Sequence, residues 1–446
     1  MMIEGLRAYP DVRPTELPWL GGIPVHWEVR RNGRLFALRR ETGFPELPIL
    51  EVSIGRGVRV RDLGDGGRKQ QMGDRAKYQR AVRGDLAYNM MRMWQGAVGV
   101  APADGLVSPA YIVARPYPET NSAYYGYLFR TAAYMREVDV FSRGIVPDRN
   151  RLYWDSFKQM PSPYPPLEEQ RLIVRFLDWH GAQTAKLIRA KQNALKLAAE
   201  QRDVLTHEVV STPGTRPIRL DVVTDLILRP IVRDSAETYT SVGLFNRGRG
   251  IFRKPLTRGD DLGDSSFFWI EDGDLILSGQ FAWEGAIALA GPDEDGCVAS
   301  HRYHILRGKE GILQTTYLAS FLRTELGQLM LDEHSRGAAG RNRPLNIRSL
   351  RKEKVPIPPQ SQQARLVEII MLEKRLSSSI ARYTEHLREF RARLIADVVT
   401  GVLDVHEAAA SLPEQIESFE PLGTEGEADQ FEDSESEDFE PEEAAA

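Results

Sequence analysis

The chain has 446 residues, enough for two to four domains, and its 42% hydrophobic and 27% charged residues are ordinary for a globular protein. No apolar run approaches the roughly 18 residues of a membrane span, and residues 1–10 lack the apolar segment of a signal peptide. The lone cysteine, Cys297, excludes an internal disulfide, so the sequence predicts a reducing, cytoplasmic location.

The net charge of −5 is unevenly distributed along the chain. From Glu407 onwards there are 15 of the 63 acidic residues and no Lys or Arg, so residues 1–406 carry about +10. Arg makes up 47 of the 58 basic residues; genome composition is an alternative reason for that preference, but it does not explain the excess of base over acid. A basic body predicts nucleic-acid binding, because neutralised phosphates supply much of the affinity.

Residues 1–160 are predicted to form a first module of short strands. A loop at 19–24 leads into a strand-like stretch, and β-prone runs punctuated by glycine follow. A short helix is expected over 124–136. The proline-rich segment 161–166 must be extended and closes the module.

A long helix is predicted within the central region 161–213. Residues 167–210 contain no proline and a single glycine, and a helix of that length would measure roughly 66 Å. Such a length predicts a coiled coil or a long strut. Its apolar positions keep roughly helical spacing and are Ile173, Leu177, Ile188, Leu195 and Leu205.

A second module, residues 214–354, is followed by a second long helix in 355–405. Here a heptad pattern predicts a coiled coil, with apolar positions at Leu366, Ile369, Leu376, Ile380, Leu387 and Leu394. Residues 406–446 are acidic and poor in large apolar groups, so they are predicted to be a disordered tail. The tail either improves solubility or competes for a DNA site.

The second half of the chain repeats motifs of the first. Gly84-Asp85-Leu86 and Trp94-x-Gly96-Ala97 return 189 residues later as Gly273-Asp274-Leu275 and Trp283-x-Gly285-Ala286. A repeat of this length is a duplicated domain, since each copy can build its own core. The expected fold class is therefore α/β, more closely α+β, with two related modules and two long helices. Different interiors in the two copies predict two related tasks on different targets.

Several enzymatic motifs are missing from the sequence. Neither Pro-Pro pair, at 165–166 or 358–359, lies in the loop of an amino-methyltransferase. The Gly308-Lys309 pair lacks the Ser or Thr of a P-loop, and none of the 11 lysines follows an acid by two positions, as a common nuclease core requires. His301 and His304 have no third ligand nearby, so ordinary side chains are favoured over a metal site.

The ordered motifs resemble type I restriction–modification specificity subunits over residues 1–405. The opening 19–29, the stretch 84–97, Ser108-Pro109-Ala110-Tyr111 and the proline-led helix start at 165–178 carry the resemblance. The second copy is looser, because Leu277 to Trp283 replaces Tyr88 to Trp94.

The resemblance implies two target-recognition domains that each read half of a split, asymmetric DNA sequence. The two helices would lie antiparallel as a spacer and as a platform for modification subunits, of which there would be two. Those partners would hold S-adenosylmethionine and transfer methyl groups to adenine N6, while restriction subunits would add ATP- and Mg-dependent translocation and cleavage. This chain would be a non-catalytic subunit of a phage-defence complex. The alternatives are a DNA methyltransferase with its own catalysis and a coiled-coil scaffold without sequence specificity.

Basic and amide side chains in both modules are the candidate DNA contacts. Two glycine-rich basic stretches favour DNA contact over a merely solvated face, and Arg92, Gln95 and Gln280 are candidate base readers. Trp94 and Trp283 are expected to anchor turns rather than stack on bases. The remaining candidates are Arg56, Arg59, Arg61, Arg68 and Lys69 in the first basic stretch, Arg247, Arg249, Arg253 and Lys254 in the second, and Arg149, Arg151, Arg341 and Arg343 as phosphate clamps.

Overall fold

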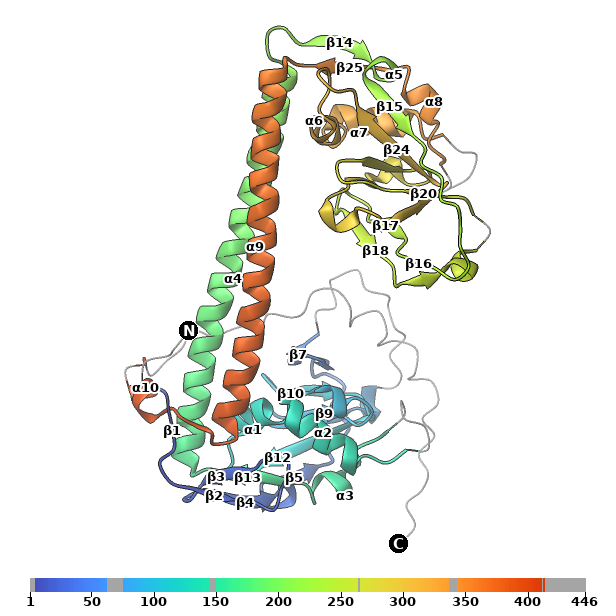
Figure 1. Cartoon of the computed structure of the whole chain (residues 1–446). Coiled ribbons are helices and arrows are strands. Elements are labelled where there is room, and N and C mark those ends of the chain that lie inside the picture. The colour runs from blue at the N-terminus through green and yellow to red at the C-terminus, as the bar shows by residue number, and fades with distance from the viewer. Residues whose placement is uncertain are drawn as a thin grey trace. The chain divides into compact units, whose positions relative to one another are not determined.

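The computed structural model describes residues 5–61, 75–144, 150–263, 265–336, 343–410 and 412–413. The chain divides into two compact units, Met1–Arg189 with Tyr383–Ala446, and Ala190–Arg382 (Figure 1). Each of the two long helices contributes to both units; they are α4 (Leu167–Val210) and α9 (Gln360–Val399). The expected fold class, with two sheet-based modules and two long helices, is confirmed.

The first module is built on a four-stranded antiparallel sheet of order β10-β9-β12-β5. Its strands are β5 (Phe36–Arg39), β9 (Leu86–Asn89), β10 (Val98–Val100) and β12 (Tyr111–Pro116). Two-stranded antiparallel pairs add β4 (Glu28–Arg31) with β13 (Pro161–Tyr164), β6 (Leu50–Ser53) with β7 (Gly57–Val60), β8 (Gln79–Ala81) with β11 (Gly105–Val107), and β2 (Val12–Pro14) with β3 (Gly22–Pro24).

The helices of the first module are short and begin at polar caps. The single helix predicted over 124–136 is instead two helices, which end and begin on either side of residues 129–131. The second helix begins after Thr131, whose hydroxyl accepts a hydrogen bond from the backbone N–H of Tyr134 as an N-terminal cap. The helical segments are α1 (Ser122–Leu128), α2 (Ala132–Phe141) and α3 (Trp154–Phe157), with 3-10 turns η1 (Asn32–Arg34), η2 (Arg75–Lys77) and η3 (Met93–Gln95).

The second module repeats this architecture. Its four-stranded sheet has the order β15-β24-β21-β22. This is the strand order of the first module, with β15, β24, β21 and β22 in the places of β5, β12, β9 and β10. These strands are β15 (Thr224–Ile227), β21 (Leu275–Ser278), β22 (Ile287–Leu289) and β24 (Tyr303–Gly308). The paired strands are β14 (Arg216–Arg219) with β25 (Lys354–Ile357), β16 (Thr238–Tyr239) with β19 (Thr257–Arg258), β17 (Val242–Leu244) with β18 (Ile251–Arg253), and β20 (Phe267–Trp269) with β23 (Val298–Ser300).

Short helices complete the second module. They are α5 (Leu220–Val223), α6 (Thr315–Phe321), α7 (Glu325–Glu333) and α8 (Ile347–Leu350), with 3-10 turns η5 (Gly259–Leu262), η6 (Ala282–Glu284) and η7 (Pro292–Glu294). Among the described residues, no helix combines the length and apolar character that crossing a membrane requires.

Each four-stranded sheet has a hydrophobic core on both of its faces. Successive strand residues point to opposite faces and so contribute to the two cores in turn. In β9, Leu86 and Tyr88 join the core that contains the helices, whereas Ala87 joins a second core with Val52 and Val58 of the β6–β7 hairpin. The second module follows the same rule, with its β17–β18 hairpin on the face opposite the helical core. Each hairpin therefore forms an outer layer of its module.

Within each unit, α4 and α9 pack against one another. In the first unit, Ile173 and Leu177 share a core with Leu394 and Val398. In the second unit, Arg202 contacts Glu373 at 2.9 Å, and Val209 and Leu366 belong to the same hydrophobic core. Residues later in α4 lie near residues earlier in α9, so the two helices are antiparallel in this unit.

The folded part of the first unit continues beyond residue 405, where the composition predicted the disordered tail to begin. Residues 406–410, assigned from composition to the acidic tail, form helix α10 (His406–Ala410), which follows strand β26 (Leu403–Asp404). Strand β26 pairs with β1 (Arg7–Ala8), and Val405 and Ala409 are fully buried. Burial of these apolar side chains places the segment in the first unit. The predicted disorder of 414–446 lies outside the described residues.

Candidate nucleic-acid interface

The β6–β7 hairpin presents the first basic stretch. Its strands pair from Leu50 with Val60 to Ser53 with Gly57, so Arg56 lies in the connecting turn. Arg59 is exposed on β7 and forms an ion pair with Glu51. Arg61 follows the hairpin and is half-buried; the candidates Arg68 and Lys69 lie outside the described residues.

A glycine allows this hairpin to approach the sheet closely. A Cβ atom built on Gly99, in β10, would lie 2.7 Å from the backbone nitrogen of Val58 and 2.9 Å from the Cα atom of Gly57. No side chain fits between two backbones at that distance. Gly99 therefore fixes the height of the hairpin above the sheet.

The β17–β18 hairpin presents the second basic stretch, and hydrogen bonds attach its turn to the repeated Trp-x-Gly motif. The backbone N–H of Arg247 donates to the Glu284 carbonyl oxygen, and that of Gly248 to the Gly285 carbonyl oxygen, each at 2.8 Å. Arg247 adopts a left-handed conformation with φ of 57° to make these contacts. The sequence motif that defines the repeat thus supports the candidate DNA-binding loop.

The second hairpin carries aromatic rings beside its arginines. Phe245 and Phe252 contact one another with ring centroids 4.7 Å apart, and both are more than one-third exposed. The guanidinium of Arg249 lies over the Phe245 ring, 5.0 Å from its centroid, and Arg253 donates to the Asp293 carbonyl oxygen at 3.2 Å. Stacking holds the Arg249 side chain at the hairpin surface.

The two tryptophans anchor the turns that carry the candidate base readers, as predicted. The indole N–H of Trp94 donates to the Met91 carbonyl oxygen at 2.9 Å, and that of Trp283 to the Gln280 carbonyl oxygen at 3.1 Å. Gln95 is exposed beside its tryptophan, whereas the candidates Arg92 and Gln280 are half-buried.

The predicted phosphate clamps occupy different environments. The backbone of Arg151 forms two hydrogen bonds with that of Arg143. Arg343 forms an ion pair with Asp332 at 2.8 Å, and its guanidinium lies 4.7 Å from the centroid of the Trp283 ring. Arg343 thus already has partners in its own module, and phosphate contact by this group stays a prediction. Arg149 and Arg341 lie outside the described residues.

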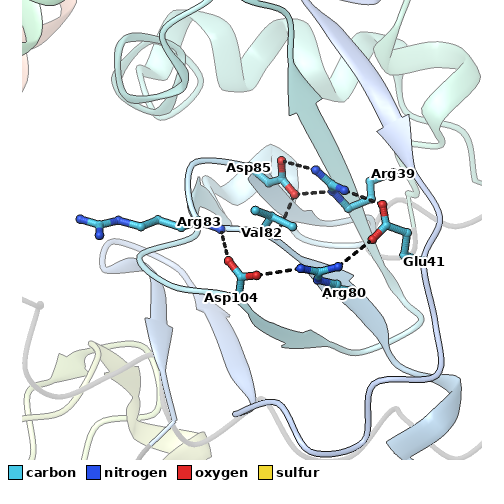
Figure 2. A network of polar contacts seen from close by, with 7 residues as sticks. All are labelled: Arg39, Glu41, Arg80, Val82, Arg83, Asp85 and Asp104. Carbon is cyan, nitrogen blue, oxygen red and sulfur yellow. Dashed lines mark hydrogen bonds and ion pairs between the residues drawn. The ribbon is translucent and has the colours of Figure 1, made fainter.

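The aspartate of the repeated Gly-Asp-Leu motif is a buried ion-pair partner that motif inspection did not reveal. In the first module, Asp85 accepts from Arg39 Nε at 2.6 Å and from the Val82 backbone N–H at 2.8 Å (Figure 2). In the second, Asp274 is fully buried and contacts Arg229 at 2.7 Å and Arg307 at 2.8 Å. The repeat identified both aspartates, but their arginine partners lie far from them in the sequence.

The network around Asp85 extends to the β8–β11 pair. Arg80 contacts Asp104 at 2.9 Å and Glu41 at 3.4 Å (Figure 2). A backbone hydrogen bond from Arg83, followed by the contact with Arg80, lowers the pKa of the Asp104 carboxyl. Figure 2 shows the Arg83 side chain extending away from this network. Its guanidinium makes none of the contacts drawn there.

A second pair of arginines, also unpredicted, lies beside the turns of the two hairpins. Arg130 follows α1 and donates through Nη1 to the Gly55 carbonyl oxygen at 3.4 Å and through Nε to the Gly126 carbonyl oxygen at 3.1 Å. Burial lowers the pKa of Arg130. Arg323 occupies the matching position after α6, where a Cβ atom on Gly248 would lie 3.4 Å from its Nε. An arginine therefore lies near the hairpin turn in both copies, after α1 in the first and after α6 in the second.

The apolar seams of the long helices are partly buried. Most predicted seam positions are buried, Leu195, Leu205 and Ile369 are half-buried, and Leu376 is 40% exposed. Leu197 and Leu372 in the second unit are 64% and 65% exposed, and neither is among the apolar positions predicted for the long helices. The buried seam residues are Ile173, Leu177, Ile188, Leu366, Ile380, Leu387 and Leu394.

Within the described ranges, no group of three or more His, Cys, Asp or Glu side chains is arranged to hold a metal ion. His304 lies in β24, where burial lowers the pKa of its imidazole.

Comparisons with solved structures find chains of similar fold. The chain is similar to a chain from a solved type I restriction–modification system, studied for complex assembly and conformational transition, with 15% identity, a TM-score of 0.50 and coverage of 84% of this chain and 98% of that one. It is also similar to the HsdS subunit from Thermoanaerobacter tengcongensis (17% identity, TM-score 0.45, coverage 85% and 98%) and to the type I S subunit from M. genitalium (13%, 0.41, 83% and 96%). No protein-family model matches the sequence, and a search of curated proteins finds no match.

At this identity the likeness concerns the fold. The type I restriction–modification fold that the sequence motifs predicted is confirmed at that level.

Proposed function

We propose that this chain is the sequence-specific DNA-recognition subunit of a type I restriction–modification complex. One observation carries the proposal: both modules place an arginine-bearing hairpin on the sheet face opposite their helical core. Arg56 and Arg249 occupy matching turns of these hairpins. Arginine is suited both to bidentate contact with guanine and to contact with phosphate.

Differences between the hairpins support an asymmetric, bipartite target. Where the first hairpin exposes Arg59, the matching position of the second is occupied by Phe252. A guanidinium favours guanine edges or phosphates, whereas an aromatic ring favours apolar contact such as the thymine methyl group. The two modules would therefore read different half-sites, with the paired helices setting the spacing between them.

The long helices are the proposed platform for partner subunits. Leu197 and Leu372 are 64% and 65% exposed on the long helices, and Leu376 is 40% exposed. Large exposed apolar side chains of this kind are typical of a surface that a partner covers. The partners would be two adenine-N6 methyltransferase subunits, which bind S-adenosylmethionine, and restriction subunits that use ATP and Mg. The chain itself would supply recognition and no catalytic group.

Methylome sequencing of cells with and without the gene tests the proposal. One split adenine-methylation motif should disappear when the gene is deleted. Footprinting of the assembled complex should show two protected patches of different sequence at a fixed spacing. Uniform, salt-sensitive protection without a preferred site would contradict sequence recognition, and methyl transfer by the purified chain alone would contradict the assignment of catalysis to partners.

A further inference from the structure

A pocket of about 470 Å³ opens in the second module beside its candidate DNA-binding hairpin. Its lining includes Lys254, which follows β18, and Gln280 and Phe281 of the β21–η6 turn. The volume lies within the range of small-ligand sites. Two of the candidate DNA contacts, Lys254 and Gln280, therefore converge on one cavity.

The turn that carries Gln280 and Phe281 is held in place by Ser278. The Ser278 hydroxyl oxygen accepts from the backbone N–H of Gln280 at 3.3 Å and from that of Phe281 at 3.1 Å. Ser278 itself is buried and also lines the pocket. The turn is thus shaped before any ligand arrives, and the Phe281 ring remains 37% exposed at the pocket.

The pocket lining combines aromatic rings, cations and hydrogen-bonding groups. Phe267, Phe281 and Tyr303 line it, and the exposed ring of Phe281 provides aromatic surface, which stacks on the flat face of any nucleobase. Lys254 and Arg302 provide positive charge for a phosphate. This is the chemistry of a nucleotide site.

The hydrogen-bonding groups of two further lining residues indicate which nucleobases the pocket would accept. The Asp261 carboxylate can only accept hydrogen bonds when ionised, and the Gln280 amide both donates and accepts. Carboxylates recognise the amino group of cytosine, and glutamine recognises adenine through its amino group and N7. The lining therefore favours a base that carries an exocyclic amino group.

We propose that this pocket binds one amino-bearing nucleotide of the DNA half-site, unstacked from the duplex. The inference rests on the proposed function, because the duplex must lie on this face of the second module. The base stacks against Phe281, its amino group donates to Asp261, and its backbone phosphate lies near Lys254 and Arg302.

A mismatch scan of the second half-site tests this proposal with the full chain assembled with its modification subunits. Elsewhere in a recognition site a mismatch weakens binding, but opposite an unstacked base it strengthens binding, because the base pair is already broken. One position should therefore show affinity raised by about tenfold. Phe281→Ala should weaken binding of the matched duplex by about tenfold, as expected for a lost base–aromatic stack, and remove the mismatch gain.

Trp269→Ala is the matched control, because its side chain is also 37% exposed but does not line the pocket. This variant should keep the mismatch gain. Replacing the unstacked base by an analogue without its amino group should weaken binding to the unsubstituted chain but not to Asp261→Ala.

Three outcomes would overturn the proposal in distinguishable ways. Mismatches that weaken binding at every position, with both footprints intact, would refute the pocket's role and leave the proposed function standing. Absence of any site-specific footprint would refute the proposed function itself. Binding of free dAMP, detected by calorimetry and lost in Phe281→Ala, without a mismatch gain would assign the pocket to a free nucleotide instead.

Discussion

Single residues hold the frame of each module through buried ion pairs. Asp85 and Asp274 occupy matching positions of the repeat, and each binds an arginine about 45 residues earlier, Arg39 at the end of β5 or Arg229 two residues after β15. Each aspartate also accepts from a backbone N–H three residues before it. One carboxylate thus fixes both a turn and a pair of strands, which explains why this residue type occurs in both copies.

Replacing Asp274 with Asn should destabilise the second module. The change removes the charge that compensates Arg229 and Arg307 at a fully buried site, and breaking such a pair lowers the free energy of unfolding by about 3 kcal/mol. Urea denaturation followed by circular dichroism measures the effect. Asp260→Asn, in an exposed pair with Arg258, is the control and should change it by less than about 0.5 kcal/mol. Equal effects of the two substitutions would refute the role of the buried pair.

Replacing Arg249 with Ala should weaken contact with the second half-site only. Loss of one phosphate contact is expected to reduce the slope of log affinity against log salt by about 1. Arg56→Ala should do the same at the first half-site. Arg216→Ala, exposed on β14, removes the same charge away from the hairpins and should leave both footprints unchanged. Loss of both footprints in either single hairpin variant would contradict independent reading by the modules.

At the scale of elements, backbone packing places each hairpin directly on its sheet. Gly99 leaves space for the backbone of Gly57 and Val58, and Arg130 donates to the turn. In the second module the turn is attached to η6 by backbone hydrogen bonds. The hairpins are held by different contacts, yet both belong to the outer layer.

Gly99→Ala should displace the first hairpin, because the added methyl group would overlap its backbone. Overpacking of this kind lowers the free energy of unfolding by about 1–3 kcal/mol. Gly126→Ala, in α1, is the contrasting control: its nearest contact would be an ordinary 3.5 Å, and alanine stabilises a helix by up to about 1 kcal/mol. Thermal melts and footprinting should show loss of the first half-site in Gly99→Ala alone. A Gly99→Ala protein that retains stability and protection would refute the proposed role of this glycine.

At the scale of the whole molecule, each compact unit is built from segments far apart in the sequence. The first unit takes the beginning of α4, the end of α9 and the strand–helix segment β26–α10, which pairs with the N-terminal strand β1. The boundaries predicted from the sequence assigned each long helix to one region, whereas the compact units divide both helices between them. Stability of the first unit therefore depends on residues beyond 400.

Two truncations should separate the acidic tail from the folded C-terminal segment. Ending the chain after Pro413 removes only acidic, tail-like sequence and should leave the melting temperature unchanged. Ending it after Gly401 also removes β26 and the buried Val405 and Ala409, so the melting temperature should fall by several degrees. Differential scanning fluorimetry measures both. Equal melting temperatures would show that β26 and α10 contribute nothing to the first unit.

The sequence by itself determined the duplication, the two long helices and the two basic stretches. These features depend on local information, namely motif spacing, helical periodicity without proline, and composition. The tryptophan turns were also predictable, because the motif recurs beside Gly-Ala in both copies. Each of these predictions concerns residues close together in the chain.

Tertiary structure alone decided which distant residues meet. It paired Asp85 with Arg39, brought Arg130 beside the turn of the first hairpin, joined β26 to β1, and gathered Lys254, Asp261 and Gln280 around one pocket. In a chain with 47 arginines, residue type cannot identify the arginine that faces a given carboxylate. Those partners are selected by the packing of strands and helices from remote segments, which no local pattern records.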